Sequence, residues 1–331
     1  MMKITLMKRF FDTVSDERRS PIAEKIAGRW FEENVKVRVV RASSNFITHV
    51  ETPENTYYLR FNHSTERTRE FIEAELSFIQ HLTNHGIHAN RPIPSLSELI
   101  VETVPTEMGD FHGVLFEAIQ GNQYESDELN LEKFRSWGSA LGKVHKESTG
   151  LVVPGIPTWK DHISRVRSMV SKSDEVIWSE LDSVEMKLNA LPVDDGIFGI
   201  IHFDFEMDNL LWNKDSVGIV DFDDCAYYWY AADIAYALRD LYEDQVDRFN
   251  VDDERVQAFL EAYRSIRPIS EEELSHIPIF IRLHNLYTYT RLYRSIEDDP
   301  ATDEPQWVRN IRDKLRKKIE TYCEDIEMNP I

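Results

Sequence analysis

The hydrophobic pattern of this chain changes once, close to residue 120, and this change limits the possible folds more than any other feature. Before it, short runs predict strands at 35–40, 46–51, 56–62, 98–104 and 111–119. After it, apolar residues recur at helical spacing over 131–147, 158–171, 174–191, 253–266, 271–296 and 305–326. Strands followed by helices predict an α+β protein of two lobes, 1–120 and 121–331, with the boundary near residues 119–122.

Two helices are expected in the N-terminal part, at 16–34 and 70–84. In the second, Glu75 falls in the middle of the apolar stripe. A carboxylate that faces a core is costly unless a cation pairs with it. The nearest candidate cation is Arg60, at the end of the strand just upstream. A place at the edge of the stripe, with the carboxylate in water, fits the segment equally well.

Composition limits the partners. The chain has 331 residues, of which 59 are acidic and 38 basic, and its formal net charge is −21. Such a field opposes binding to nucleic acid and to anionic membranes, so neither is expected as a partner. We expect a monomer or homodimer that acts on a small molecule.

The expected cellular compartment follows from the absence of a disulfide framework, a signal peptide and a membrane-spanning stretch in the sequence. Its two cysteines, Cys225 and Cys323, form neither a disulfide framework nor a zinc motif. The N-terminal apolar run is interrupted by Lys8 and Arg9, so no signal peptide is expected. The longest apolar stretch, 227–238, is shorter than the ~20 residues that span a bilayer. A cytoplasmic protein is therefore expected.

One strand-rich island, 196–223, interrupts the helical part and carries the chain's most reactive side chains. An apolar run leads to His202 and Asp204. Two short strands then follow, joined by a turn at 213–215.

If this hairpin folds about Lys214, Asn209 and Asp221 nearly face each other at its open end. Asp204 enters that end from the preceding segment, with His202 beneath. Two carboxylates and an amide oxygen are hard donors that suit Mg²⁺. In phosphoryl transfer one Asp can accept the proton of the attacking hydroxyl while the other donors hold the metal on the phosphates. Asp204 is then the base.

Two other interpretations of the island stay open. A polar turn with exposed acids is the simplest, and an exposed acid run is the default expectation for Asp223 and Asp224. A metal-dependent hydrolase could use His202, Asp204, Asp221 and Asp223, although no second histidine cluster lies nearby.

The runs HFDFEMDN (202–209) and IVDFDD (219–224) resemble the signature of the aminoglycoside phosphotransferase/choline kinase family. Further matches occur in the family's order over residues 35–295: SSN (43–45), LR (59–60), Glu75, LGKVH (141–145) and YAADIA (230–235). The resemblance implies a bilobal protein-kinase-like fold, with an antiparallel sheet and one main helix before a larger helical lobe. It also implies transfer of the γ-phosphoryl group of ATP to a hydroxyl of a small molecule.

The resemblance carries roles onto matching residues. It implies Asp204 as catalytic base, Asn209 and Asp221 as ligands of Mg²⁺, and Asp233 as a brace of the catalytic loop. Around the nucleotide it implies that Arg60, paired with Glu75, binds the phosphates. In place of a glycine-rich loop, Ser43, Ser44 and Asn45 would supply further hydrogen bonds to phosphate. Backbone groups of the segment 116–119, those of Glu117 and Ile119, would contact adenine. Arg60 stands where an ammonium is usual, and its planar fork differs in geometry.

The acceptor is left open among aminoglycosides, choline, amino alcohols and hydroxy amino acids, because fold does not decide among them. Glu206 and Asp208 beside the base favour a cationic acceptor, unless both are solvated. Tyr287, Tyr293 and Arg294 either border an acceptor pocket or belong to the core. His145, on the apolar stripe of its helix, is expected to be a core histidine. A non-catalytic nucleotide-binding scaffold of the same fold is the alternative function.

Overall fold

A computed structural model describes residues 1–32, 35–125, 128–171, 174–214, 216–242, 249–296 and 304–328. Contacts divide the chain into two compact units. One boundary between the units follows Ile119. A single boundary does not separate them, however, because residues 78–89 belong to the second unit and residues 291–317 to the first. Unit 1 comprises Met1–Ser77, Asn90–Ile119 and Arg291–Lys317, and unit 2 comprises Phe78–Ala89, Gln120–Thr290 and Lys318–Ile331.

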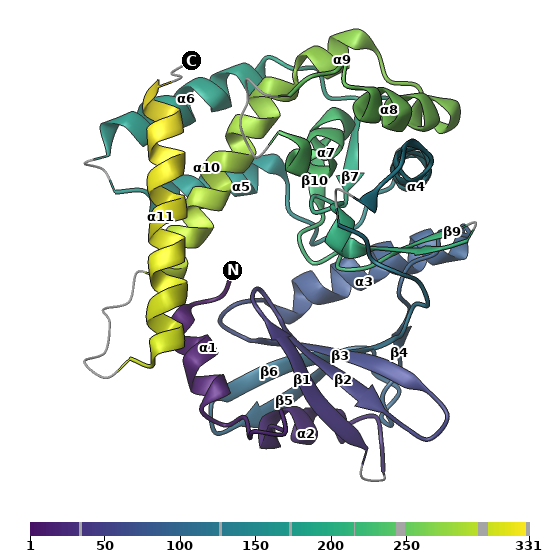
Figure 1. Ribbon diagram of the computed structural model, residues 1–331, viewed down its shortest axis with the longest axis vertical. Coiled ribbons are helices and arrows are strands. Elements are labelled where there is room, and N and C mark those ends of the chain that lie inside the picture. The colour runs from purple at the N-terminus through teal and green to yellow at the C-terminus, as the bar shows by residue number, and fades with distance from the viewer. Residues whose placement is uncertain are drawn as a thin grey trace. The chain divides into compact units, whose positions relative to one another are not determined.

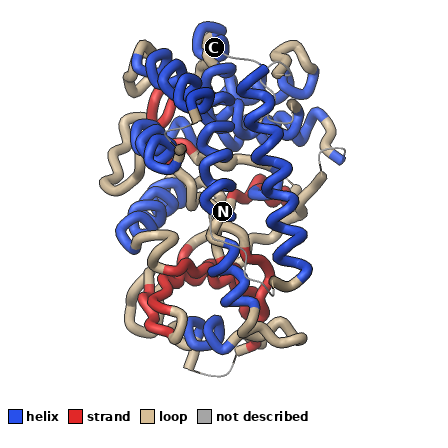
Figure 2. The backbone as a smooth tube through the Cα atoms, turned by 90° about the vertical axis from the view of Figure 1, so that its left-hand side faces the viewer, coloured by secondary structure: helices blue, strands red, loops and turns tan. Residues whose placement is uncertain are grey.

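Unit 1 is built on an antiparallel sheet (Figures 1 and 2). Neighbouring strands are β1 (Lys36–Ala42), β2 (Phe46–Glu51), β3 (Thr56–His63), β6 (Gly109–Glu117) and β4 (Pro92–Ile93), and β5 (Glu102–Thr106) pairs with β6. The strands expected at 35–40, 46–51, 56–62 and 111–119 are present, and the last of them ends two residues early, at Glu117. The strand expected at 98–104 begins only at Glu102, because a turn precedes it, in which Ser95 N–H donates to Leu99 O at 2.8 Å.

One face of this sheet covers an apolar core with helices α1 (Ile4–Phe11) and α2 (Pro21–Ala27). The ring of Phe10 lies 4.3 Å from that of Phe46, and Phe46 stacks on Phe61 at 5.3 Å. Burying aromatic rings of this size supplies much of the free energy that holds the helices to the sheet.

The helix expected at 16–34 is wrong in extent, and α1 was not expected. Pro21 occupies the first position of α2, where its missing N–H costs nothing, and the helix ends at Gly28. Trp30 then turns back into the core and donates Nε1–H to Ile93 O at 2.8 Å. Burial of Trp30 outweighs the continuation of a short helix.

Unit 2 is mostly helical and contains two small two-stranded sheets, β7 (Phe198–Ile201) with β10 (Ala226–Trp229) and β8 (Leu210–Asn213) with β9 (Ser216–Ile219). The described α-helices after residue 120 are α4 (Leu131–Ser148), α5 (Trp159–Met169), α6 (Glu175–Asn189), α7 (Tyr230–Ala237), α8 (Glu254–Ile266), α9 (Glu271–Ser275), α10 (Ile277–Ile296) and α11 (Gln306–Met328). Helix α3 (Arg69–Asn84) has its last turns in unit 2.

The helical segments expected from the pattern are present, with two differences. The segment expected as one helix at 271–296 is two, α9 and α10, interrupted at His276. Pro278 explains the interruption, because proline is tolerated in a first helical turn but not inside a helix. The second difference is β10, a strand that the sequence pattern did not predict and that leads directly into α7. None of the described helices is long and apolar enough to cross a membrane.

Candidate active site

The loop after β7 carries Asp204, and a single buried carboxylate shapes this loop. Asp233 of α7 accepts the backbone N–H of His202 at 2.8 Å and that of Phe203 at 2.9 Å. Phe203 has φ +72°, a left-handed conformation that is costly for a residue with a side chain. Two charge-assisted hydrogen bonds offset this cost. Asp233 therefore braces this loop, as the family resemblance implied.

Asp233 is itself oriented by His145 of α4, whose Nε2 lies 2.9 Å from Asp233 Oδ2. Burial lowers the pKa of His145, so the neutral ring donates Nε2–H to the carboxylate and accepts the Tyr263 hydroxyl at Nδ1, at 2.8 Å. The expectation of a satisfied core histidine is confirmed.

Asp204 contacts an amide and a guanidinium. Asn209 Nδ2 donates to Asp204 O at 2.8 Å and to its Oδ2 at 3.2 Å. Arg239 Nη2 donates to Asp204 Oδ1 at 2.8 Å and also to Glu206. Sequence reasoning missed Arg239. Two acids at 204 and 206 call for a cation, but nothing in the spacing selects one arginine from the many in this half of the chain.

The guanidinium of Arg239 therefore contacts two carboxylates, those of Asp204 and Glu206, and the pKa values of these two groups shift in opposite directions. Burial opposes the charge on Asp204, but Arg239 outweighs it and lowers the pKa of Asp204. Burial and then repulsion from Asp204 raise the pKa of Glu206 to about 7. Asp204 is thus ionised at neutral pH, as a proton acceptor must be.

The hairpin after this loop folds as expected. Leu210 pairs with Ile219, and Val220 N–H donates to Asn209 O at 3.0 Å, so Asp221 follows one residue beyond the pair. Lys214 lies at the turn with φ +42°, whereas Asp215, the last residue of the expected turn, lies outside the described residues.

His202 links the loop to the hairpin. Its side chain is fully buried, and Nε2 lies 3.1 Å from Val220 O. Burial lowers the pKa of His202, so its neutral ring donates Nε2–H to this carbonyl. A buried imidazole engaged with the backbone gives no support to a metal-dependent hydrolase. The default of an exposed acid run is also wrong, because Asp223 and Asp224 are 5% and 9% exposed. Fully buried Phe222 draws this turn inward.

The donors near Asp204 fit a small divalent cation. Because Asn209 donates its Nδ2 to Asp204, its Oδ1 is the atom left for a cation. Asp221, with φ +67°, supplies a carboxylate at the same end of the hairpin. Few hard oxygen donors, completed by water and phosphate, are the ligands that Mg²⁺ prefers.

Unit 1 holds the expected cation–carboxylate pair. Arg60 of β3 donates Nη1–H and Nη2–H to the two oxygens of Glu75 of α3, at 2.7 and 2.6 Å. The two residues are 5% and 1% exposed. The guanidinium carbon lies 5.2 Å from the centre of the Phe116 ring. The predicted pairing is confirmed, and the alternative with Glu75 in water is wrong.

The turn between β1 and β2 places its three candidates differently. Asn45 is buried, and its Oδ1 accepts Asn62 Nδ2 at 2.5 Å. Asn62 shares a face of β3 with Arg60, since they are two residues apart. The hydroxyls of Ser43 and Ser44 instead accept Arg41 Nε at 3.2 Å and Arg291 Nη2 at 3.2 Å.

The segment expected beside adenine closes β6. Glu117 is exposed, and its N–H donates to Arg91 O at 3.0 Å, so this donor is already used. Ile119 lies past the strand end and is half-buried. No acceptor contacts the Ile119 N–H in the part of the chain that the structure describes.

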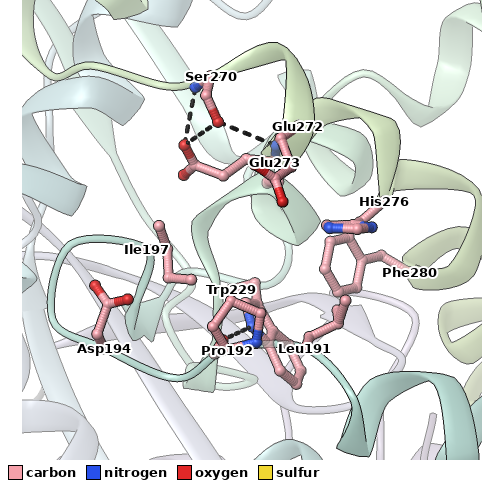
Figure 3. A pocket seen from close by; sticks show the side chains of 11 residues that line it. Leu191, Pro192, Asp194, Ile197, Trp229, Ser270, Glu272, Glu273, His276 and Phe280 are labelled. Carbon is pink, nitrogen blue, oxygen red and sulfur yellow. Dashed lines mark hydrogen bonds between the residues drawn. The ribbon is translucent and has the colours of Figure 1, made fainter.

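A separate pocket of about 200 Å³ is drawn in Figure 3. Ile197 in its wall precedes β7, whereas Asp204 follows the strand. Four extended residues span ~13 Å, so the pocket lies at the opposite end of β7 from the base. Its lining contains none of the predicted site residues: it consists of Leu191, Pro192, Asp194, Ile197, Trp229, Ala231, Ser270, Glu272, Glu273, His276 and Phe280.

Comparison with known proteins decides the family. The sequence model of the phosphotransferase enzyme family matches residues 37–269. The chain belongs to this family. The match includes both the Arg60–Glu75 pair and the segment from Asp204 to Asp233. An enzyme that transfers phosphate to a small molecule is thereby confirmed, and the non-catalytic scaffold is not supported.

Individual relatives are similar over most of their length. Amicoumacin kinase of Bacillus subtilis (strain 168) is 25% identical over 293 residues, covering 86% of this chain and 87% of the relative. Homoserine kinase of Sinorhizobium medicae (strain WSM419) is 25% identical over 271 residues, covering 78% of each.

Solved structures confirm the fold. Amicoumacin kinase hAmiN, in complex with AMP-PNP, Ca²⁺ and Ami, superposes with a TM-score of 0.75 at 21% identity and covers 95% of this chain and 96% of that one. A microcompartment-associated aminopropanol kinase gives 0.70 at 21% identity, covering 92% and 94%. The expected α+β class with the kinase-like fold is confirmed.

Proposed function

We propose that this phosphotransferase uses ATP with Mg²⁺ to phosphorylate a hydroxyl of a small, amine-bearing acceptor. The observation that carries the proposal is the environment of Asp204, an ionised carboxylate held by Asn209 and Arg239 beside a hairpin that ends in Asp221. Phosphoryl transfer depends mainly on positioning and charge stabilisation, and this arrangement supplies both. ATP and Mg²⁺ are supplied in the cytoplasm, where we propose that the enzyme acts.

Asp204 is the proposed general base. As the acceptor oxygen attacks the γ-phosphorus, the bond to the β,γ-bridging oxygen breaks and ADP leaves, while an oxygen of Asp204 takes the hydroxyl proton. Arg239 keeps the carboxylate ionised and fixes its orientation. Asn209 Oδ1 and the Asp221 carboxylate would hold Mg²⁺, which when bound offsets the charge of the phosphates.

The proposed nucleotide contacts come from unit 1. Arg60, oriented by the two oxygens of Glu75, would donate to phosphate, since a planar guanidinium can serve both partners. Asn45, in the turn between β1 and β2, is held by Asn62 and would add a hydrogen bond to phosphate. The hydroxyls of Ser43 and Ser44 would have to exchange their arginine partners for phosphate. Backbone groups of Glu117 and Ile119 would contact adenine, the first through its carbonyl and the second through its N–H.

The acceptor class rests on charge and on the relatives. Relatives are named for homoserine and the solved kinase for aminopropanol, which both carry an amine and a hydroxyl. Glu206 already contacts Arg239, so it offers less to a cationic acceptor than the sequence suggests. Exposed Asp208 remains beside the base, and the net charge of −21 favours cations overall.

The decisive experiment replaces the base. With an acceptor found by thermal shift from amino alcohols, hydroxy amino acids and aminoglycosides in the presence of Mg·ATP, we expect Asp204→Asn to lower kcat by ~10²–10⁴-fold. Binding of Mg·ATP, followed by calorimetry, should persist. Asp208→Asn is the matched control for kcat: it removes a nearby exposed carboxylate that the proposal assigns to attracting the acceptor, so it should raise KM for a cationic acceptor and leave kcat near that of the wild type. Full turnover in Asp204→Asn would remove Asp204 as the base.

A further inference from the structure

Three potential metal ligands meet in unit 2, outside the candidate active site. His81 lies in the last turn of α3, His85 follows that helix directly, and Glu147 lies in the last turn of α4. One ligand atom of each lies within 4.8 Å of the others. The two imidazole rings are 4.2 Å apart between centroids and tilted by 34°.

Backbone carbonyls fix the tautomers of both rings. His81 Nε2 lies 2.9 Å from Glu147 O, and His85 Nδ1 lies 2.8 Å from His81 O. A carbonyl can only accept, so these two nitrogens carry the protons. The other nitrogens, Nδ1 of His81 and Nε2 of His85, then carry lone pairs. Metal-binding histidines characteristically donate their second ring nitrogen to a carbonyl or carboxylate in this way.

The electrostatic setting favours a cation. His81 and Glu147 belong to the C-terminal turns of two helices, where the helix dipole gives partial negative charge. Within the described ranges, Glu147 contacts His81 through its backbone carbonyl, and no hydrogen bond or ion pair engages its carboxylate. This carboxylate and one nitrogen of each imidazole ring lie within 4.8 Å of one another, so one ion could contact all three side chains.

We propose that His81, His85 and Glu147 form a second metal site, for a divalent transition ion of the zinc class. Two nitrogens and one carboxylate are ligands that Zn²⁺ accepts, with a fourth position left for water. The donors at Asn209 and Asp221 are oxygen only and suit Mg²⁺, so the two sites select different ions. The bound ion joins the end of α3 to the end of α4 and stabilises the folded protein.

The test is Zn²⁺ titration of the untagged full-length protein by calorimetry, after chelator treatment and with excess Mg²⁺ present. We expect one Zn²⁺ per chain at this site and a rise in melting temperature. His85→Gln and Glu147→Gln should each weaken Zn²⁺ binding by ~10-fold or more and remove that rise. His88→Gln is the matched control, since His88 is an exposed histidine three residues from His85 that is not part of the cluster.

Co²⁺ provides a spectroscopic signature. Nitrogen ligation should give visible d–d bands in the wild type and in His88→Gln, and these bands should be lost in His85→Gln. Turnover with Mg·ATP verifies that every variant is folded, because none of these residues is assigned to phosphoryl transfer. Equal Zn²⁺ affinity in all four proteins would overturn the proposal, as would Co²⁺ bands that survive His85→Gln.

Discussion

At the scale of single residues, the loop that carries Asp204 depends on a carboxylate that never reaches solvent. Asp233 is fully buried and accepts three hydrogen bonds, from the backbone of His202 and Phe203 and from His145. Each of these donors would be left unsatisfied if the carboxylate were removed, and a buried unsatisfied group costs ~1–3 kcal/mol. The left-handed conformation of Phe203 would also lose its restraint.

We therefore predict that Asp233→Ala lowers the free energy of unfolding by at least ~3 kcal/mol and lowers kcat as well. Urea denaturation and steady-state kinetics measure the two effects. Asp208→Ala is the control, because Asp208 is exposed. An Asp233→Ala protein with the stability of the wild type would show that the loop holds its shape without this carboxylate.

Glu206 predicts a pH dependence. Burial and the nearby Asp204 raise its pKa from the usual 4.5 to about 7, so the native state binds this proton more tightly than the unfolded chain. The resulting stabilisation is complete below pH ~4.5 and is lost as pH rises through ~7. We expect the free energy of unfolding of the wild type, relative to Glu206→Gln, to fall by on the order of 3 kcal/mol across this window.

Chemical denaturation of both proteins from pH 4.5 to 8 provides the measurement. The difference between the two curves cancels the titrating groups that do not interact with Glu206. Asp204 does interact with it, but the pKa of Asp204 is lowered, so this carboxyl stays ionised in both proteins over the measured range. Parallel curves across the whole range would mean that Glu206 ionises normally in the folded protein.

The residue scale also shows what sequence can predict. The Arg60–Glu75 pair follows from sequence because a carboxylate inside an apolar helical stripe requires a cation, and one ends the preceding strand. The contact of Arg239 with Asp204 does not follow, because it depends on how α7 packs beside the loop. The burial of Asp223 and Asp224 was missed for the same reason, since a run of acids looks solvent-exposed without its neighbours.

At the scale of elements, the sequence predicted those helices and strands whose formation depends mainly on residues close in the chain. The β8–β9 hairpin was predicted correctly because two short strand-like runs flank a turn. The start of α2 at Pro21, the interruption of α9 and α10 before Pro278, and the pairing of β10 with β7 depend on proline chemistry or on distant partners. Strand β10 is aromatic and short, and only its pairing with buried β7 distinguishes it from a helical segment.

The packing of α4 against α8 allows a sharper prediction. A Cβ atom on Gly138 would lie 2.1 Å from Phe259 O, a backbone atom that cannot move unless the helices separate. We expect Gly138→Ala to destabilise the protein by ~1–3 kcal/mol despite the better helix propensity of alanine. Thermal and urea unfolding measure this.

Gly28→Ala is the matched control for Gly138→Ala. A Cβ on Gly28 would meet only atoms 3.5 Å away or more, and its φ of −62° is ordinary for alanine. This substitution should leave the stability unchanged or raise it by up to ~1 kcal/mol. Equal effects of both substitutions would contradict a close contact specific to Gly138.

At the scale of the whole molecule, the division into two units depends on the fold, whereas the net charge depends on the sequence alone. Which residues belong to each compact unit could not be fully predicted from sequence. Helices α3, α10 and α11 each contribute residues to both units, and no local pattern marks the residue at which a helix passes from one unit to the other. The net charge of −21, by contrast, is a sum over the sequence and needs no fold. Self-repulsion at this charge disfavours the compact state.

This charge leads to a prediction about salt. Screening reduces repulsion between exposed acids, and the buried pair of Arg60 with Glu75 is screened far less. Exposed ion pairs contribute little, so their loss cannot cancel the gain. We expect the melting temperature to rise between ~0.02 and ~0.3 M NaCl, where the Debye length falls below ~10 Å. KCl should act equally if screening is the cause. A melting temperature that falls with salt would mean that surface ion pairs outweigh the repulsion of the whole molecule.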